Sequence, residues 1–261
     1  MNPVFVQSVG LAGPGLNGWD VSRAVVAGAV PYRCEPLPRL NPDILPANER
    51  RRSSEVVRLA LTVAQEAMRA SNLPLDAVAT VFASSDGDGQ TLHHICEALA
   101  SPGCEVSPTH FHNSVHNAPA GYWSIATGCK LPSNSLCAYD VSFAAGLLDA
   151  ATQVVVERRP VLLVAFDAPF PPPLDKVRGV EHAFAVALLL VPEATAQTLA
   201  RWEISLGPDE RPTELPHPFS VLRSNPAARA LPLLHGLASR KEETVRLAYS
   251  SDSDVVIQCR P

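Results

Sequence analysis

The chain has 261 residues, of which 46% are hydrophobic and 18% are charged. This length can bury a substantial core, and the composition is far from that of a disordered chain. The formal net charge of −5 offers no concentrated positive surface, so composition argues against binding to nucleic acid or to an anionic membrane.

The sequence lacks segments typical of export or membrane insertion. Its start, MNPVFVQSVGLAGPG, has no basic stretch followed by an unbroken apolar run. The longest apolar runs, such as FAVALLLV, are far shorter than the roughly 20 residues that span a bilayer. We therefore expect a cytoplasmic protein without a membrane span, whose six cysteines are reduced thiols in or near the core. They are Cys34, Cys96, Cys104, Cys129, Cys137 and Cys259.

The first third of the chain predicts a strand, two helices and a second strand. The strand VFVQSVGLAG is followed by a short helix around GWDVSRAVVAG and a proline-rich connection. A clear helix begins at Ser53 or Ser54, where apolar residues recur every three or four positions, and stops at Asn72 and Pro74. The run AVATVFASS is typical of a strand buried on both faces.

The middle of the chain continues this alternation. The helix QTLHHICEALAS is expected to bury Leu92, Ile95 and Leu99, and a polar loop, PGCEVSPTHFHNSVHN, follows it. The helix APAGYWSIATG has a proline in its first turn and a glycine at its end. The stretch LPSNSLCAYDVSFAAGLLDAA predicts a second buried central strand that turns sharply into a helix running from Val141 to about Arg158. VLLVAFDA predicts a third central strand.

Beyond PFPPPLD the pattern changes to strands: FAVALLLV, RWEISLG, TVRLAYSS and DVVIQCRP, interrupted by a proline-rich excursion. Alternating strands and helices followed by strands predict a layered α-β-α fold with a mixed five-stranded central sheet and extra C-terminal strands. We expect one domain over residues 1–261, with its core at about 53–192 and the C-terminal strands and proline-rich loop in 193–261.

The turn between LCAY and SFAAG is occupied by Asp140. At a helix N-terminus the backbone N–H groups lack partners and the helix dipole favours negative charge. A cysteine there loses its proton more readily. An aspartate there is a good N-cap that stabilises the helix by about 0.5–2 kcal/mol, so we expect Asp140 to cap the long helix.

The order SPTHFHNSVHNAPAGYWSIATGCKLPSNSLCAYDVSFAAGLLDAA, followed by RRPVLLVAFDAP, resembles the N-terminal half of β-ketoacyl synthases of the thiolase superfamily. Those enzymes have an Asn before a small-residue helix, then a Pro-Ser pair, a strand, the nucleophilic Cys and a helix rich in Ala and Gly. The resemblance extends from about Glu55 to Val191 and implies a thiolase-like half. The positions that match the pattern are Asn117, Gly121, Ser124, Gly128, Pro132, Ser133 and Ser135.

Two departures from the family pattern bear on catalysis. Placing Pro132 and Ser133 on the Pro-Ser pair puts Asp140, not Cys137, at the nucleophile position. A ketosynthase also resembles two such halves, and its second half brings two catalytic histidines. After Val191 only 70 residues remain (261 − 191 = 70), without a Gly-Thr-x-Thr-like or Gly-Phe-Gly-Gly-like stretch. Because a carboxylate attacking a thioester would form an energetically uphill mixed anhydride, Asp140 should not carry acyl groups.

Within the family, the chain resembles a truncated chain-length-factor type subunit of aryl-polyene or xanthomonadin-like pathways. Such subunits lack the nucleophile, pair with an active ketosynthase and shape the acyl tunnel. The resemblance implies an active β-ketoacyl synthase and an acyl carrier protein with a phosphopantetheine-bound acyl chain as partners, and no cofactor. It makes Thr91, His94 and Ile95 candidates for tunnel gating. Further tunnel or interface candidates are Phe111, Val115, His116 and Asn117. The Leu92/Leu99 stripe also allows Ile95 to be an ordinary core residue.

A second hypothesis is a small acyltransferase or thioesterase that uses Cys137 or Ser142 with a histidine such as His112 or His116. Against it, Cys137 is expected to be a buried, inert thiol inside an apolar strand. Ser142 lacks the flanking glycines of a nucleophile elbow.

The histidines of THFHNSVHN invite a metal site, but a loop does not converge ligands reliably at about 2.0–2.1 Å. We therefore predict no metal.

Overall fold

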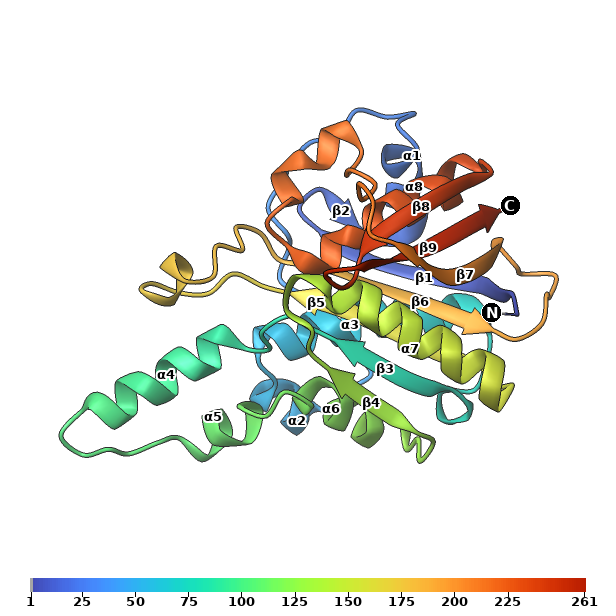
Figure 1. Cartoon of the computed structure of the whole chain (residues 1–261). Coiled ribbons are helices and arrows are strands. Elements are labelled where there is room, and N and C mark those ends of the chain that lie inside the picture. Colours follow the sequence, from blue (N-terminus) through green and yellow to red (C-terminus); the bar gives the residue numbers. More distant parts are fainter. Residues whose placement is uncertain (1) are drawn as a thin grey trace.

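The computed structural model describes residues 2–261 and contains one mixed sheet in the order β4-β3-β5-β6-β1-β7-β9-β8, with the short β2 paired to β1 (Figure 1). Its strands β3, β4 and β5 are parallel, and the remaining pairs are antiparallel. The strands are β1 (Val4–Gly13), β2 (Leu16–Asn17), β3 (Ala79–Ala83), β4 (Ser133–Leu136), β5 (Val161–Asp167), β6 (Phe184–Val191), β7 (Ala200–Pro208), β8 (Glu243–Ala248) and β9 (Ser253–Arg260).

The predicted mixed central sheet is confirmed by β4-β3-β5-β6-β1, and the C-terminal strands extend it beyond β1 through β7. One placement was wrong. The strand at Ser133–Leu136 is not a buried central strand but the edge strand of the sheet, and its first two residues are exposed. Its short polar sequence, SNSL, suits an edge, because an edge strand needs no apolar neighbour on both sides.

Two helical layers cover the sheet and create two cores. In β5, Val161, Leu163 and Ala165 belong to the core that contains α7, whereas Leu162, Val164 and Phe166 belong to the core that contains α3. This alternation follows from the two-residue period of a strand. The helices that pack on the two faces are α7 (Ser142–Glu157), α1 (Trp19–Val26) and α8 (Leu231–Ser239) on one, and α3 (Glu55–Ser71) and α6 (Ala118–Thr127) on the other.

The ends of α3 and α6 agree with the sequence predictions. The Ser54 hydroxyl accepts a hydrogen bond from the Val57 N–H at 3.3 Å, and Asn72 ends α3 in the left-handed conformation. Gly128 ends α6 with a φ of 69°, a conformation that glycine adopts without strain.

Helix α4 (Gly89–Ala100) differs most from the prediction. Together with α5 (Pro108–Asn113) it forms an arm, residues 89–113, that projects from the body (Figure 1). Leu92 and Leu99, predicted to be buried, are 47% and 56% exposed, and Ile95 is half-buried. The three-and-four spacing correctly predicts a helix with an apolar face. The prediction that this face is buried is wrong, because it does not pack on the core of this chain.

Two helices in proline-containing segments were not predicted from the sequence. The predicted loop before α6 contains α5, and the proline-rich excursion contains α8. In both, a proline occupies the first turn, where its missing N–H has no helical partner to lose. The remaining short helices are α2 (Ala47–Arg52), η1 (Leu75–Ala77), η2 (Tyr139–Val141), η3 (Leu174–Lys176), η4 (His217–Leu222) and η5 (Pro226–Ala230).

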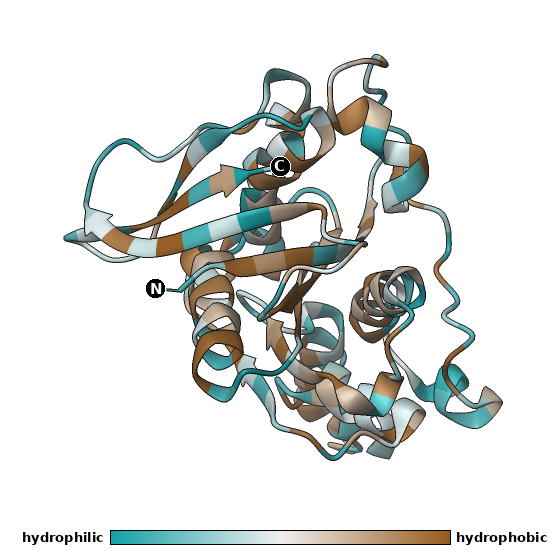
Figure 2. Cartoon of the chain, turned by 90° about the vertical axis from the view of Figure 1, so that its right-hand side faces the viewer, coloured by the Kyte–Doolittle hydropathy of each residue, from teal (hydrophilic) through white to brown (hydrophobic). Residues whose placement is uncertain are grey.

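Hydropathy follows burial along the sheet. The strands beside the C-terminus alternate hydrophobic and hydrophilic residues (Figure 2), in agreement with one buried face. None of the helices in residues 2–261 combines the length and the apolar run needed for a bilayer crossing.

Candidate functional site

The parallel strands β3, β4 and β5 end at the same edge of the sheet, and polar residues follow each of them. Ser84, Ser85 and Asp86 follow β3, the turn at Asp140 follows β4, and Asp167 is the last residue of β5. In open α/β sheets this edge is where ligands and reacting groups are held. The candidate site is therefore the group of side chains at this edge.

A guanidinium joins two of these segments. Arg178, from the loop between β5 and β6, donates through Nε to Asp86, and its Nη1 lies 2.7 Å from Asp140 Oδ1. Its guanidinium carbon also lies 3.9 Å from the centre of the Tyr139 ring. The Arg178 side chain is only 11% exposed, which strengthens these charge-assisted contacts relative to a surface ion pair.

The predicted capping role of Asp140 is wrong. Val141 occupies the N-cap position of α7, and Asp140 lies in the preceding turn η2 with its carboxylate on Arg178. Ser142 organises the turn instead. Its hydroxyl accepts from the Ala138 N–H at 2.9 Å and donates to the Tyr139 carbonyl at 2.7 Å. A hydroxyl can perform both functions, whereas an ionised carboxylate can only accept.

The cysteines also depart from the prediction. All six are free thiols, as expected, but only Cys259 is fully buried, and its pKa is raised to about 12 by burial. Cys137 does not lie inside a buried strand: it follows β4 and is exposed. Its thiol donates a hydrogen bond to the Ser85 carbonyl at 2.8 Å.

Asp167 is the buried acid of the site, with 3% exposure. Its Oδ1 accepts from the Ser85 N–H at 2.7 Å and lies within hydrogen-bond distance of the Ser84 and Ser85 hydroxyls. Burial raises the pKa of Asp167 to about 6, although the serine hydrogen bonds oppose this rise. The Ser85 hydroxyl also reaches Asp86, which connects Asp167 to the Arg178 contacts.

The histidines lie in three different environments. His116 Nε2 lies 3.2 Å from the Ser84 carbonyl, beside the candidate site. His112 packs edge-on against Tyr122, and His94 stacks on His110 with ring centres 4.7 Å apart, joining α4 to α5. Among residues 2–261, none of these contacts joins a histidine to Cys137 or Ser142. Within the same described range, no group of three or more potential ligands is arranged to hold a metal ion.

The arm and α6 form a second part of the candidate site, an open apolar groove of about 590 Å³. The groove brings together three of the predicted residues, Phe111, Val115 and Asn117. Phe111 is 69% exposed, and Ile125 of α6 is also exposed. Contiguous exposed apolar side chains of this kind are typical of an interaction surface.

The other predicted residues lie along α4 or beside the sheet edge. Thr91 is buried at the first turn of α4, where its N–H donates to Asp88 Oδ1 at 2.9 Å. His94 is half-buried, and its ring lies within hydrogen-bond distance of Gln90. The structure thus distributes the predicted set between the arm, the groove and the sheet edge.

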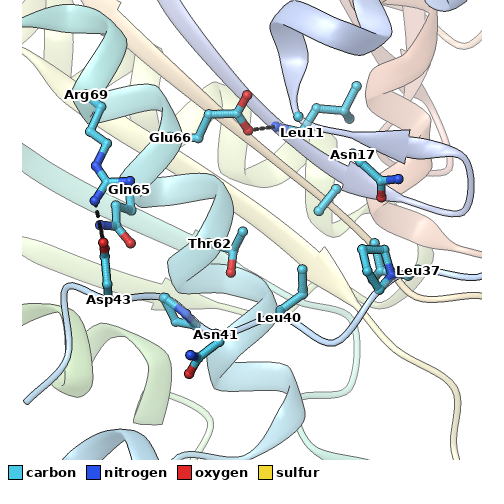
Figure 3. Close-up of a pocket in the computed structure, with 14 residues that line it drawn as sticks. Leu11, Asn17, Leu37, Leu40, Asn41, Asp43, Thr62, Gln65, Glu66 and Arg69 are labelled. Carbon is cyan, nitrogen blue, oxygen red and sulfur yellow. Dashed lines mark hydrogen bonds and ion pairs between the residues drawn. The ribbon is translucent and has the colours of Figure 1, made fainter. Parts of the chain in front are cut away.

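A further cavity of about 480 Å³ lies between α3 and the proline-rich connection (Figure 3). Its half-buried acid, Glu66, accepts from the Leu11 N–H at 2.9 Å and the Trp19 N–H at 2.5 Å, and partial burial raises its pKa. Asp43 at the rim is paired with Arg69 at 2.7 Å. Both carboxylates therefore hold chain segments together, and we assign them structural roles.

Sequence reasoning missed Arg178, Asp86, Asp167 and Tyr139. Asp167 was detectable, because an acid closing a fully apolar strand must find partners at the strand end. Asp86 lies in SSDGDG, the turn between β3 and α4. Nothing in the proline-rich loop around Arg178 predicts that it reaches two carboxylates.

The mixed central sheet, the helices on both faces and the strand-turn-helix at Asp140 define a thiolase-like, ketosynthase-type fold. The sequence matches the family described as beta-ketoacyl synthase, N-terminal domain, over residues 28–251, and the chain belongs to this family. No curated protein matches the sequence significantly.

Several solved structures have the same fold. One is a chain from the complex of the ketosynthase ApeO with its chain length factor ApeC from Xenorhabdus doucetiae, with 24% identity, a TM-score of 0.74 and 98% of each chain covered. Another is a chain of the ishigamide ketosynthase/chain length factor, with 12% identity, a TM-score of 0.76 and coverage of 100% of this chain and 99% of that one. A chain of AntDE:AntF, a type II polyketide synthase acyl-carrier protein in complex with its ketosynthase, has 12% identity, a TM-score of 0.74 and 99% coverage of both.

The raised pKa of Asp167 predicts a particular pH dependence of stability. Because the folded protein binds this proton more tightly than the unfolded chain, the contribution is complete below pH 3.8 and is lost as pH rises through about 6. Asp167→Asn cannot ionise. Relative to wild type, its free energy of unfolding should increase by about 2 kcal/mol between pH 4 and pH 7. This is most of the ~3 kcal/mol that a shift from 3.8 to about 6 gives at ~1.4 kcal/mol per pKa unit.

Urea unfolding at several pH values measures this difference, with Asp76→Asn as the control at an exposed position. Parallel pH profiles for wild type and Asp167→Asn would show that folding does not raise the pKa of Asp167.

Proposed function

We propose that this chain is a non-catalytic, ketosynthase-like subunit that pairs with an active β-ketoacyl synthase and shapes the tunnel for acyl chains delivered by an acyl carrier protein. The observation that carries this proposal is the Asp140–Arg178 pair at the nucleophile turn. The strand-turn-helix has the form that presents a nucleophile, but the residue at this position is Asp140, whose carboxylate is bound to the Arg178 guanidinium.

The neighbouring groups support the same conclusion. A nucleophile is activated by an adjacent base that accepts its proton. Cys137 instead donates a hydrogen bond to the Ser85 carbonyl, and the Ser142 hydroxyl donates one to the Tyr139 carbonyl. Both acceptors are backbone carbonyls and not side-chain bases, which disfavours the alternative of an acyltransferase or thioesterase based on Cys137 or Ser142.

Three surfaces support a partner. The open groove beside α6, the exposed apolar face of α4 and the free edge of β4 lie on the same part of the chain, residues 89–136. Aromatic and aliphatic anchors surrounded by polar groups are typical of protein interfaces. That structures with this fold include ketosynthases in complex with chain length factors and with an acyl-carrier protein supports the choice of partner.

Within this proposal, Thr91, His94 and Ile95 on α4 face the acyl tunnel, and Phe111, Val115, His116 and Asn117 lie at or near the subunit interface. We further propose that residues 1–261 act as one domain in the cytoplasm. The product class that we propose is a fatty-acid or polyketide-type chain of the aryl-polyene or xanthomonadin-like kind.

The interface is tested by charging its aromatic anchor. Phe111→Glu should weaken binding to an active ketosynthase from the same organism at least about thirtyfold, because a carboxylate buried in the complex replaces an apolar contact. Val156→Glu is the matched control: Val156 is also 69% exposed but lies near the end of α7. Calorimetric titration measures both affinities. Equal affinities for the two variants would show that the groove is not part of the interface. If wild type does not bind the ketosynthase, the proposal of a ketosynthase partner is wrong.

The tunnel role is tested at Ile95. Ile95→Phe adds volume to the half-buried face of α4 and should shorten the product made by the reconstituted pair, because the added ring occupies space that the growing chain would fill. Mass spectrometry of the released chains measures their length. Leu99→Phe, at a more exposed position of the same helix, is the control. An unchanged length distribution for Ile95→Phe would contradict tunnel gating by this residue.

A further inference from the structure

The loop between β5 and β6, residues 168–183, crosses the candidate site and is called the strap here. Near its end, Glu181 and His182 form hydrogen bonds with Ser224 and Asn225. At the candidate site the strap makes two further contacts. Arg178 reaches Asp86 and Asp140, and Phe170 packs against Gly89 at the first residue of α4. The strap therefore touches both the nucleophile turn and the root of the arm.

The contact at Phe170 leaves no free space. A Cβ atom placed on Gly89 would overlap three atoms of the Phe170 ring. Glycine at this position is what permits the ring to lie against the helix start. Asp88 caps the same turn by accepting a hydrogen bond from the Thr91 N–H. The Phe170 ring therefore lies against the first turn of α4, where the helix leaves the body of the protein.

The contact at Arg178 is multiple, and its guanidinium is sheltered. The side chain of Arg178 is 11% exposed and that of Asp86 is 22% exposed, whereas Asp140 is 57% exposed. Both members of the surface pair Arg158–Glu193 are exposed, at 67% and 75%. Asp86 precedes α4 by three residues, so one guanidinium holds the arm root with one nitrogen and the nucleophile turn with another. Planar guanidinium groups suit such two-sided bonding better than ammonium groups.

The turn that Arg178 binds is held in an unfavourable backbone conformation. Tyr139 has a φ of 53°, in the left-handed region that non-glycine residues seldom occupy. The Arg178 guanidinium lies over its ring at 3.9 Å while binding the adjacent Asp140. Such conformations persist only where surrounding contacts fix them. Here the Ser142 hydroxyl fixes the Tyr139 backbone, and Arg178 fixes the Tyr139 ring and the adjacent carboxylate.

We propose that Asp140 is a positioning residue that fastens the strap through Arg178, and that the strap in turn sets the root of the α4–α5 arm. In this proposal the Asp140 carboxylate has a structural role. Through Arg178 and the strap, it couples the turn at the nucleophile position to the arm that faces the partner. Only this last step, the meaning of the arm for pairing, rests on the proposed function.

Hydrogen exchange of the isolated chain tests the coupling directly. In Asp140→Asn and in Arg178→Gln, amides of the strap and of residues 86–91 should exchange roughly ten- to hundredfold faster than in wild type, because a charge-assisted bond to the sheltered guanidinium is lost. The double variant should exchange no faster than Arg178→Gln alone, since both substitutions remove the same contact. Arg178→Lys retains the charge but not the two-sided geometry, and should give an intermediate rate.

Glu193→Gln, which removes the exposed Arg158–Glu193 pair, is the matched control and should leave these amides unchanged. Wild-type exchange at residues 86–91 in Asp140→Asn would overturn the coupling. So would additive effects in the double variant. Binding of the same variants to the active ketosynthase is measured separately. If wild type fails to bind, the proposed function fails while the exchange result still decides the coupling.

Discussion

The burial of β3 and β5 between two helical layers is the constraint on which the rest of the structure depends. All residues of these two strands are buried, so polar side chains can find partners only where the strands end. Ser84, Ser85 and Asp167 gather there for that reason, and the buried carboxylate of Asp167 is satisfied by the serines. The same edge receives the turn that follows β4.

We propose that at this edge the chain has the architecture of a condensing enzyme without its chemistry. A strand, a tight turn and a helix are present, but the groups beside and within the turn are bound to one another, to the Ser85 carbonyl and to Arg178. The apolar surface lies elsewhere, on the arm and beside α6. A protein with a closed turn and an open apolar groove is suited to contribute shape to an assembly, and that is why we assign the bond-forming step to a partner.

Much of the fold was predictable because long apolar runs and clear helix periodicity are determined locally. β5, β6 and α3 appear where the sequence indicated them, and the five-stranded central sheet follows from the alternation of strands and helices. The failures share a physical cause. The apolar stripe of α4 has the same spacing whether it packs inside its own chain or against another protein. The segment SNSL of β4 is polar, but the apolar residues that flank it in the sequence led to the prediction of a buried central strand.

The site was less predictable, because its contacts depend on tertiary structure. A family resemblance identified Asp140, but not its partner Arg178, which comes from a proline-rich loop without periodicity. Ser142 replaced Asp140 in organising the helix start, since one hydroxyl both donates and accepts there. Exposure of Cys137 could not be read from an apolar neighbourhood alone.

The most direct test of the central claim is to locate the covalent acyl group in the assembled complex. The chain, the active ketosynthase and an acyl carrier protein loaded with an isotope-labelled acyl group are mixed, and the intact mass of each subunit is measured. We expect the labelled adduct on the ketosynthase and none on this chain, with the same result for Cys137→Ala. A labelled adduct on this chain that disappears in Cys137→Ala would contradict the assignment of the chemistry to the partner.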